Sequence, residues 1–165
     1  IGFKDEADWD FEPNKKTSSS IFNSHLPLVK SKAKKKLKEM FDKGDIDERY
    51  YYKQDAYMYK DLKKAIVSKN TVYQWRRVYV RENKSGECPT LTANMGTGGH
   101  NVPLIKDDLG IRKLTPRECL NFQGFPKSFK FPDDMPISQR YKQAGNAVTV
   151  NLIQKIAKIL NKSIA

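Results

Sequence analysis

The chain has 165 residues, of which 38% are apolar and 30% charged, enough for one domain with a modest core and a very polar surface. Its 31 lysines and arginines outnumber 19 aspartates and glutamates, and the resulting net charge of +12 favours a polyanionic partner, with nucleic acid as the leading candidate. The apolar runs are too short to span a bilayer, and the two cysteines make neither a disulfide framework nor a zinc site, so a reduced, cytoplasmic setting is expected.

The first 30 residues are polar and contain two prolines, which predicts a connecting segment between two structural units. The chain begins with Ile-Gly-Phe, like the end of a strand, and this suggests a piece of a longer protein. A helix is expected over 31–43, where apolar residues recur at helical spacing before Gly44. The six lysines between Lys30 and Lys38 are either a solvated helix face or phosphate contacts.

A second short helix is expected over 55–67, with Leu62 and Ile66 on its apolar face. The segment from Thr71 to Arg81 is rich in Val, Tyr and Trp and is predicted to form one strand. Alternation in such a strand puts on one side Tyr73, Trp75, Arg77, Tyr79 and Arg81. Aromatic residues between arginines suit a nucleic-acid surface, and a half-buried sheet uses the same residues, so both interpretations stand.

Three glycines within four positions, Gly96, Gly98 and Gly99, distinguish the segment 88–105. They allow the backbone to approach another molecule closely, and the hydroxyl, amide and imidazole side chains beside them suit hydrogen bonds to bases and phosphates. The alternative is a long flexible turn. A phosphate-binding P-loop is excluded because no Gly-Lys-Ser/Thr follows.

The last third of the chain predicts two helices. Thr115, Pro116 and Glu118 form the signature of a capped helix start, and Gly124 ends that helix. Prolines keep 125–137 irregular. Gly145 and Asn146 then precede an amphipathic helix whose apolar stripe consists of Val148, Leu152, Ile153, Ile156, Ile159 and Leu160.

Three stretches of the sequence, two of them in its last third, resemble the cytosine-5 DNA methyltransferase family. Arg-Lys-Leu-Thr-Pro-Arg-Glu-Cys at 112–119, followed by Gln-Gly-Phe-Pro at 123–126, resembles the ninth motif of these enzymes. Gln-Ala-Gly-Asn-Ala-Val at 143–148 resembles their tenth and last motif. The glycine-rich segment 90–101 is similar to the base-contacting loop of their target-recognition domain. The order of the three also matches the family.

Other parts of the family pattern have no counterpart in this sequence. It has no glycine-rich cofactor motif, no Pro-Cys dipeptide for the nucleophile and no Glu-Asn-Val. The resemblance therefore implies the C-terminal, DNA-reading part of an enzyme that methylates a flipped-out cytosine in a short site of a bacterial restriction–modification system. It implies S-adenosylmethionine as cofactor, with most of its pocket and the catalytic cysteine in an N-terminal lobe. The chain alone is expected to bind DNA without methylating it.

The resemblance also implies roles for particular residues. The expected DNA contacts are Gln74, Arg76, Arg77, Thr90, Thr92, Asn94, Gly96, Gly98, Gly99, His100 and Asn101. Gln74 and Arg77 are the candidates for a groove-inserting pair, and the alternative for each arginine is a surface or phosphate contact. His100 is alternatively a structural hydrogen-bonding residue. No catalytic residue and no metal ligand is expected in this chain.

The cofactor contacts that the resemblance implies are Asn146, Ala147 and Val148, and Asn146 is also expected to cap the last helix. Arg112 and Arg117 either contact phosphate or brace the glycine-rich loop, and bracing is favoured. The fold expected is α+β, a small target-recognition domain of short twisted strands with flanking helices. Its last helix is expected to pack on a Rossmann-like catalytic lobe.

The expected organisation is a connector over 1–30, a target-recognition domain over 31–137 and the tenth motif with the last helix over 138–165. The expected partners are double-stranded DNA and the catalytic lobe, without a membrane, in a cytoplasmic, DNA-associated protein. The chain is then part of a single-chain enzyme or a natural subunit of a split one. The alternatives are a stand-alone DNA-binding module and an RNA methyltransferase of the same family.

Overall fold

The computed structural model describes residues 37–76, 78–97 and 101–164, with side chains up to 161. The chain divides into two compact units, one over 33–150 and one made of 1–32 with 151–165. The first unit contains every described strand and three helices, and the second contains nearly all of α4, Val150–Ile164. Among the described residues, no helix is both long and apolar enough to cross a membrane.

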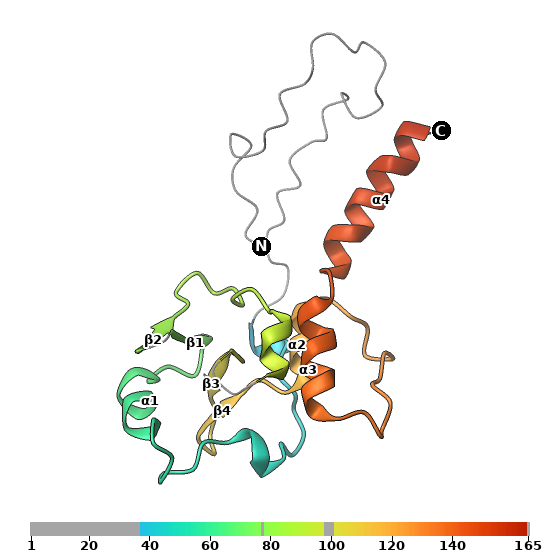
Figure 1. The fold of residues 1–165 in the computed structure, drawn as a ribbon. Coiled ribbons are helices and arrows are strands. Elements are labelled where there is room, and N and C mark those ends of the chain that lie inside the picture. Colours follow the sequence, from blue (N-terminus) through green and yellow to red (C-terminus); the bar gives the residue numbers. More distant parts are fainter. Residues whose placement is uncertain (1–36, 77, 98–100, 165) are drawn as a thin grey trace. The chain divides into compact units, whose positions relative to one another are not determined.

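A four-stranded sheet in the order β2-β1-β3-β4 organises the first unit (Figure 1). Its strands are β1 (Tyr73–Arg76), β2 (Tyr79–Glu82), β3 (Leu104–Lys106) and β4 (Ile111–Lys113), and each pairs antiparallel with its neighbours. Because side chains alternate between the faces of a strand, the sheet separates two apolar clusters. One contains Leu104 and Ile111 with Leu62 of α1, and the other contains Ile105, Val72 and Leu120 of α2.

The predicted strand over 71–81 is wrong in one respect, because the chain folds back on itself there. Strands β1 and β2 form a hairpin in which Tyr73 pairs with Glu82, Gln74 with Arg81, Trp75 with Val80 and Arg76 with Tyr79. Paired residues share a face, so Tyr79 and Arg81 lie on the face of Gln74 and Arg76 and not on the face of Tyr73. Because the paired residues Arg76 and Tyr79 are three positions apart, every residue of β2 lies on the face opposite to the one that unbroken alternation predicts.

The two helices expected before the sheet have different outcomes. Helix α1 (Tyr59–Ala65) lies inside the predicted range 55–67, and Leu62 and the following Ile66 are fully buried as expected. The helix expected over 31–43 is wrong where the structure describes it, since only a single 3₁₀ turn, Leu37–Glu39, forms there. Leu37 and Phe41 instead pack against the larger apolar cluster from an irregular segment. Residues 31–36 lie outside the described residues.

Helix α2 (Pro116–Phe122) has the start predicted from its sequence. The hydroxyl of Thr115 accepts from the Glu118 amide at 3.1 Å, and the Glu118 carboxylate accepts from the Thr115 amide at 2.7 Å, which completes the capping box. Gly124 follows the helix with φ at 81°, a backbone conformation that favours glycine.

A buried ion network holds α2 against β4. The Arg112 guanidinium, 2% exposed, donates to both oxygens of Glu118 at 2.7 and 2.8 Å and to Asp107 at 2.7 Å. Asp42 joins from the N-terminal side, with its amide donating to Glu118 and its carboxylate accepting from Thr115. Four chain segments therefore meet at α2, and every charge in the network has a partner.

Two further helices follow the irregular segment 125–136. Helix α3 (Ile137–Asn146) was not predicted, and it buries Tyr141 and Ala144, with the Tyr141 hydroxyl donating to the Leu114 carbonyl at 2.6 Å. The predicted amphipathic helix is confirmed as α4, Val150–Ile164. The capping role of Asn146 is wrong, because Asn146 is the last residue of α3 and α4 begins four residues later.

Candidate functional site

The exposed face of the β1–β2 hairpin is the first candidate contact surface. Gln74 is half-buried, while Arg76, Tyr79 and Arg81 of the same face are exposed. On β3 and β4 this face is covered by α2 and the larger apolar cluster, which accounts for the burial of Ile105 and Arg112. One face of the sheet is therefore buried on β3 and β4 and polar and largely exposed on the hairpin. Arg77, an expected contact, lies outside the described residues.

The glycine-rich segment forms a short anchored turn, at least over its first half. Residues Ala93–Gly96 make the 3₁₀ turn η5, and Leu91 and Met95 bury its apolar side in the core. The exposed polar side chains around the turn are Thr90, Thr92, Asn94 and Asn101. The Asn94 carbonyl accepts from the Thr97 hydroxyl at 2.9 Å and from the Asn101 amide at 3.3 Å. The other expected contacts, Gly98, Gly99 and His100, lie outside the described residues.

Helix α3 supports this turn through two glycines. A Cβ on Gly145 would lie 2.1 Å from the Thr92 carbonyl oxygen and 2.6 Å from the Ala93 amide nitrogen. A Cβ on Gly96 would lie 2.4 Å from the Ser138 carbonyl oxygen. These distances are far below van der Waals contact, so η5 and α3 pack backbone against backbone. The segment similar to the base-contacting loop therefore rests on the helix that carries the tenth motif (Figure 1).

The expected cofactor residues lie directly after this contact. Asn146 ends α3, and it is exposed, as is Val148. The buried side chain of Gln123 holds the segment that follows. Its amide nitrogen donates to the carbonyls of Ala144 and Ala147 at 3.3 and 3.1 Å, and its amide oxygen accepts from the Thr149 hydroxyl at 2.9 Å. The ninth-motif residue Gln123 thus fixes the backbone on both sides of Asn146.

The two arginines of the ninth motif have structural partners. Phosphate contact is wrong for Arg112, which is buried in its ion network, and its bracing acts on α2. Burial disfavours its charge, but Glu118 and Asp107 raise the pKa of Arg112 above its ordinary value. Arg117 donates to Asn121 at 2.9 and 2.8 Å and to the carbonyl groups of the 125–129 segment. It therefore braces that segment through contacts unrelated to the glycine-rich loop.

Neither of the chain's two cysteines has the properties of a nucleophile, and both lie in the described part. Burial raises the pKa of the Cys88 thiol to about 12. Burial also holds the pKa of Cys119 well above its ordinary value, and its side chain is fully buried. A thiol attacks as the thiolate, so a high pKa argues against either as the attacking group. No group of three metal-ligating side chains occurs among the residues that the structure describes.

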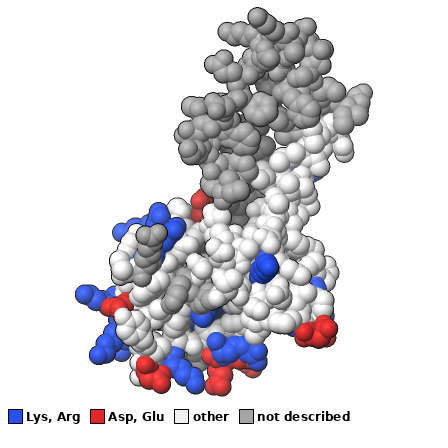
Figure 2. Space-filling view, viewed as in Figure 1, with Lys and Arg blue, Asp and Glu red and all other residues white. Residues whose placement is uncertain are grey.

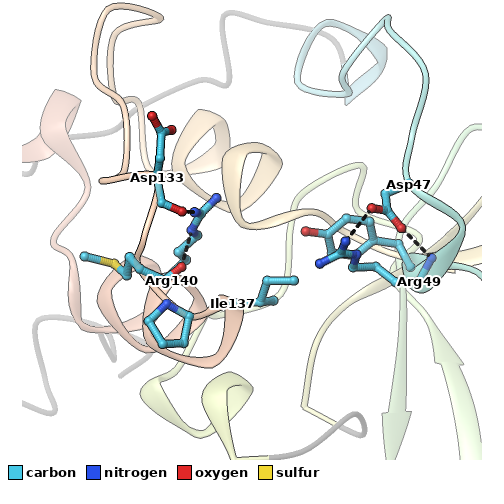
Figure 3. A pocket seen from close by; sticks show the side chains of 8 residues that line it. Asp47, Arg49, Asp133, Ile137 and Arg140 are labelled. Atoms are coloured by element: carbon cyan, nitrogen blue, oxygen red, sulfur yellow. Dashed lines mark hydrogen bonds and ion pairs between the residues drawn. The ribbon is translucent and has the colours of Figure 1, made fainter.

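A pocket of about 550 Å³ lies elsewhere, between the 47–50 turn and the start of α3 (Figure 3). Both of its arginines already have partners: Arg49 pairs with Asp47 at 2.8 Å, and Arg140 donates to the backbone carbonyls of Asp133 and Met135, both at 2.8 Å. Ile137 lies between the two groups. The pocket contains none of the residues expected to bind DNA or cofactor.

The charged surface is mixed on the face that Figure 2 shows. Lysines and arginines lie along the side and lower edge of the described part, with acidic side chains between them. The net charge therefore does not concentrate into one uniform basic patch on that face. The local arrangement of side chains, such as that on the hairpin, is therefore a better guide to a binding surface than the net charge.

The amino-acid sequence matches the model of one protein family, described as C-5 cytosine-specific DNA methylase, over residues 1–162. The chain belongs to this family. The Type II methyltransferase M.Bsp6I of Bacillus sp. (strain RFL6) is 57% identical over 129 residues, which cover 77% of this chain and 41% of that relative. The chain thus spans less than half the length of this relative.

Two more similarities extend the comparison. The human tRNA (cytosine(38)-C(5))-methyltransferase is 42% identical over 52 residues, 32% of this chain and 13% of that protein. The crystal structure of the S. pombe Dnmt2 methyltransferase superposes with a TM-score of 0.57 at 14% identity, over 82% of this chain and 44% of that chain. This likeness confirms the expected α+β fold.

Sequence reasoning missed several residues of this region. Alternation along one strand puts Tyr79 and Arg81 on the wrong face, because the sequence between Arg76 and Tyr79 has no glycine, proline or asparagine to mark the reversal. The sequence places Gly145 in the tenth motif and before a helix, but it does not predict the contact of Gly145 with η5. The amide of Gln123 carries no pattern of its own, and its role follows only from the folded structure.

Proposed function

We propose that this chain is the DNA-recognition part of a cytosine-5 DNA methyltransferase that works with a catalytic lobe, in the cytoplasm and on DNA. The observation that carries the proposal is the anchored turn η5. Its exposed polar side chains, Thr92 and Asn94, stand on a backbone fixed by Met95 in the core and by Gly145 of α3. Hydroxyl and amide groups on a rigid turn are suited to contact bases and phosphates.

The recognised polymer is proposed to be a DNA duplex with a short specific site, as in restriction–modification. Membership of the family and the 57% identity with a Type II methyltransferase support DNA as the substrate. Arg76 on the hairpin can donate two hydrogen bonds to guanine, the commonest specific contact of an arginine in the major groove. The other proposed DNA contacts are Gln74, Arg77, Thr90, Gly96, Gly98, Gly99, His100 and Asn101.

The described residues fit one edge of an S-adenosylmethionine site. Asn146 offers an exposed amide and Val148 an apolar side chain that is 57% exposed, next to a backbone that Gln123 holds in place. An exposed apolar side chain beside a polar group suits a ligand with an aliphatic chain on a sulfonium centre and charged ends. The cofactor supplies the methyl group, and Asn146, Ala147 and Val148 are proposed to close one side of its pocket.

The chemical step is proposed to depend on a cysteine of the catalytic lobe. Burial raises the pKa of both cysteine thiols of this chain, which disfavours the thiolate, and Cys119 is shut off from solvent. The chain alone is therefore expected to be inactive. Its tasks are to bind the duplex, orient the site and close the cofactor edge, while α4 is proposed to pack its apolar stripe on the lobe.

The test is a methyl-transfer assay with labelled S-adenosylmethionine on mixed duplex DNA. The chain is assayed alone and together with the part of M.Bsp6I that lies outside the matched stretch, with transfer RNA as a second substrate. The proposal is supported if the chain by itself does not methylate DNA and the mixture of chain and lobe does. Methylation by the chain alone contradicts the assigned division of labour, and methylation of transfer RNA without DNA contradicts the substrate. A lobe-dependent signal also fits a natural subunit of a split enzyme.

A further inference from the structure

The hairpin places two pairs of polar side chains on one exposed face. Gln74 pairs with Arg81, and Arg76 pairs with Tyr79 one step closer to the turn. Directly paired side chains on a face are about 5 Å apart at Cβ, and the two pairs follow each other by two residues, about 6.7 Å along the strand. The four side chains thus form a compact rectangle, with a glutamine, two arginines and a tyrosine at its corners.

The composition of this face indicates an anionic, partly apolar partner. Tyr79 is 58% exposed and Val78, at the turn, is 88% exposed. Arg76 and Arg81 flank them, while the acidic neighbour Glu82 faces the opposite side with Tyr73 and Trp75. Exposing apolar groups to water costs free energy, and apolar groups between arginines suit contact with nucleic-acid bases. The positive charge of the face complements a phosphate polymer.

The dimensions of the hairpin fit one particular place on that polymer. The major groove of B-form DNA is about 12 Å wide and admits a two-stranded β-ribbon, and successive base pairs are about 3.4 Å apart. Two residues along a strand therefore span about two base pairs. We infer that the β1–β2 ribbon enters the major groove with this face, so that Tyr79 and Arg81 are DNA contacts beside Gln74 and Arg76. This inference rests on the proposed function.

Each of the two added residues has a definite task in that arrangement. Arg81 shares a level with Gln74, so the pair reads neighbouring base edges at that level, and Arg76 with Tyr79 does so about two base pairs further along. The ring of Tyr79, next to Val78, packs against base edges and thymine methyl groups.

The experiment compares matched substitutions in the full chain. Binding to a fluorescein-labelled duplex of mixed sequence is followed by anisotropy at several salt concentrations, and preference is read by sequencing the bound fraction of a randomised duplex pool. The variants are Arg81→Ala and Tyr79→Ala. Their controls are Arg49→Ala and Tyr57→Ala, which remove the same groups from exposed positions outside the sheet. Circular dichroism checks the fold, and Arg81→Gln provides a second variant if Arg81→Ala unfolds.

Each hairpin variant is expected to weaken duplex binding by about five-fold or more and to relax the sequence preference. Both control variants are expected to bind the duplex as the unchanged chain does. Hairpin variants that bind and select like the unchanged chain overturn the ribbon and leave the proposed function standing. Equal losses in hairpin and control variants overturn it too, since they indicate unspecific charge attraction. If the unchanged chain binds no duplex, the proposed function fails, and the ribbon fails with it.

Discussion

Replacing Gly145 with alanine adds a methyl group where η5 already lies. The new Cβ would be 2.1 Å from the Thr92 carbonyl oxygen, 2.2 Å from its carbon and 2.6 Å from the Ala93 amide nitrogen. All three are backbone atoms, so rotation of a flexible side chain cannot relieve the contact. The helix and the turn must move apart, and the buried side chains of Met95 and Ala144 lose packing as they do.

Two effects of opposite sign determine the size of the change. Alanine inside a helix is favoured over glycine by about 1 kcal/mol through its smaller backbone entropy. Overpacking of a well-packed interior costs about 1–3 kcal/mol, and occasionally more. Three backbone contacts well below 3 Å put this site at the upper end, so we expect a net loss of about 1–2 kcal/mol. For a chain of this length that corresponds to a melting temperature lower by roughly 2–8 °C.

The assay is thermal unfolding followed by circular dichroism, with Gly44→Ala as the control. A Cβ on Gly44 meets nothing within 4 Å, so this substitution should leave the melting temperature unchanged or slightly raised. Gly96→Ala, whose Cβ would meet the Ser138 carbonyl at 2.4 Å, should behave like Gly145→Ala. A Gly145→Ala chain that melts with or above the unchanged chain refutes the backbone contact between α3 and η5.

Three further outcomes follow from the α2 network. Arg112→Met should lower the free energy of unfolding by about 3–5 kcal/mol in urea titrations, because it leaves the Glu118 carboxylate buried and unpaired; a loss under 1 kcal/mol contradicts the ion network. Thr115→Ala should cost about 1 kcal/mol in the same titration by removing the helix cap, and an unchanged midpoint contradicts that role. Burial raises the pKa of Asp107, but hydrogen bonds from Arg112 and others lower it overall, so its contribution is present above the unfolded pKa of about 3.9 and is lost as the pH falls below that value through the folded pKa. The stability difference between the unchanged chain and Asp107→Asn should therefore shrink in urea titrations below about pH 4, and a constant difference refutes it.

The parts of the fold that sequence predicted well are those fixed by neighbouring residues. The capping box of Thr115 and Glu118 and the glycine at 124 act within one helical turn, and the structure has all three in place. The apolar stripe of α4 is likewise a local period, and the helix confirms it. Such features depend little on what the rest of the chain does.

The parts that sequence missed depend on contacts between distant segments. The reversal between Arg76 and Tyr79 has no turn residue to mark it, and pairing in the sheet determines it. The apolar residues near Leu37 have helical spacing, yet they pack against the core from a segment with only a single 3₁₀ turn. The sequence did not predict helix α3, because the segment is polar and contains Gly145. That glycine allows the backbone of η5 to approach the helix closely.

The candidate site shows the same division. Sequence resemblance selected Thr92, Asn94 and Asn146 by their motifs, and these assignments of DNA and cofactor contacts stay predictions. The resemblance did not predict the contacts that hold these residues in place, which come from Met95, Gly145 and Gln123. Resemblance alone also assigned Arg112 a choice between phosphate and bracing, and its burial with Glu118 decides against phosphate.

The contact between α3 and η5 places the tenth motif next to both the proposed DNA-contacting turn and the proposed cofactor edge. Gly145 touches the backbone of Thr92, and the next residue, Asn146, begins the proposed cofactor edge. If the cofactor binds at Asn146 and the duplex binds at η5, both ligands act on the same end of α3, and we expect their binding to be coupled. Because linkage is reciprocal, each ligand must then change the affinity for the other by the same factor. In this proposal Gly145 belongs to neither set of contacts but lies between them, against the Thr92 backbone on one side and next to Asn146 in sequence on the other.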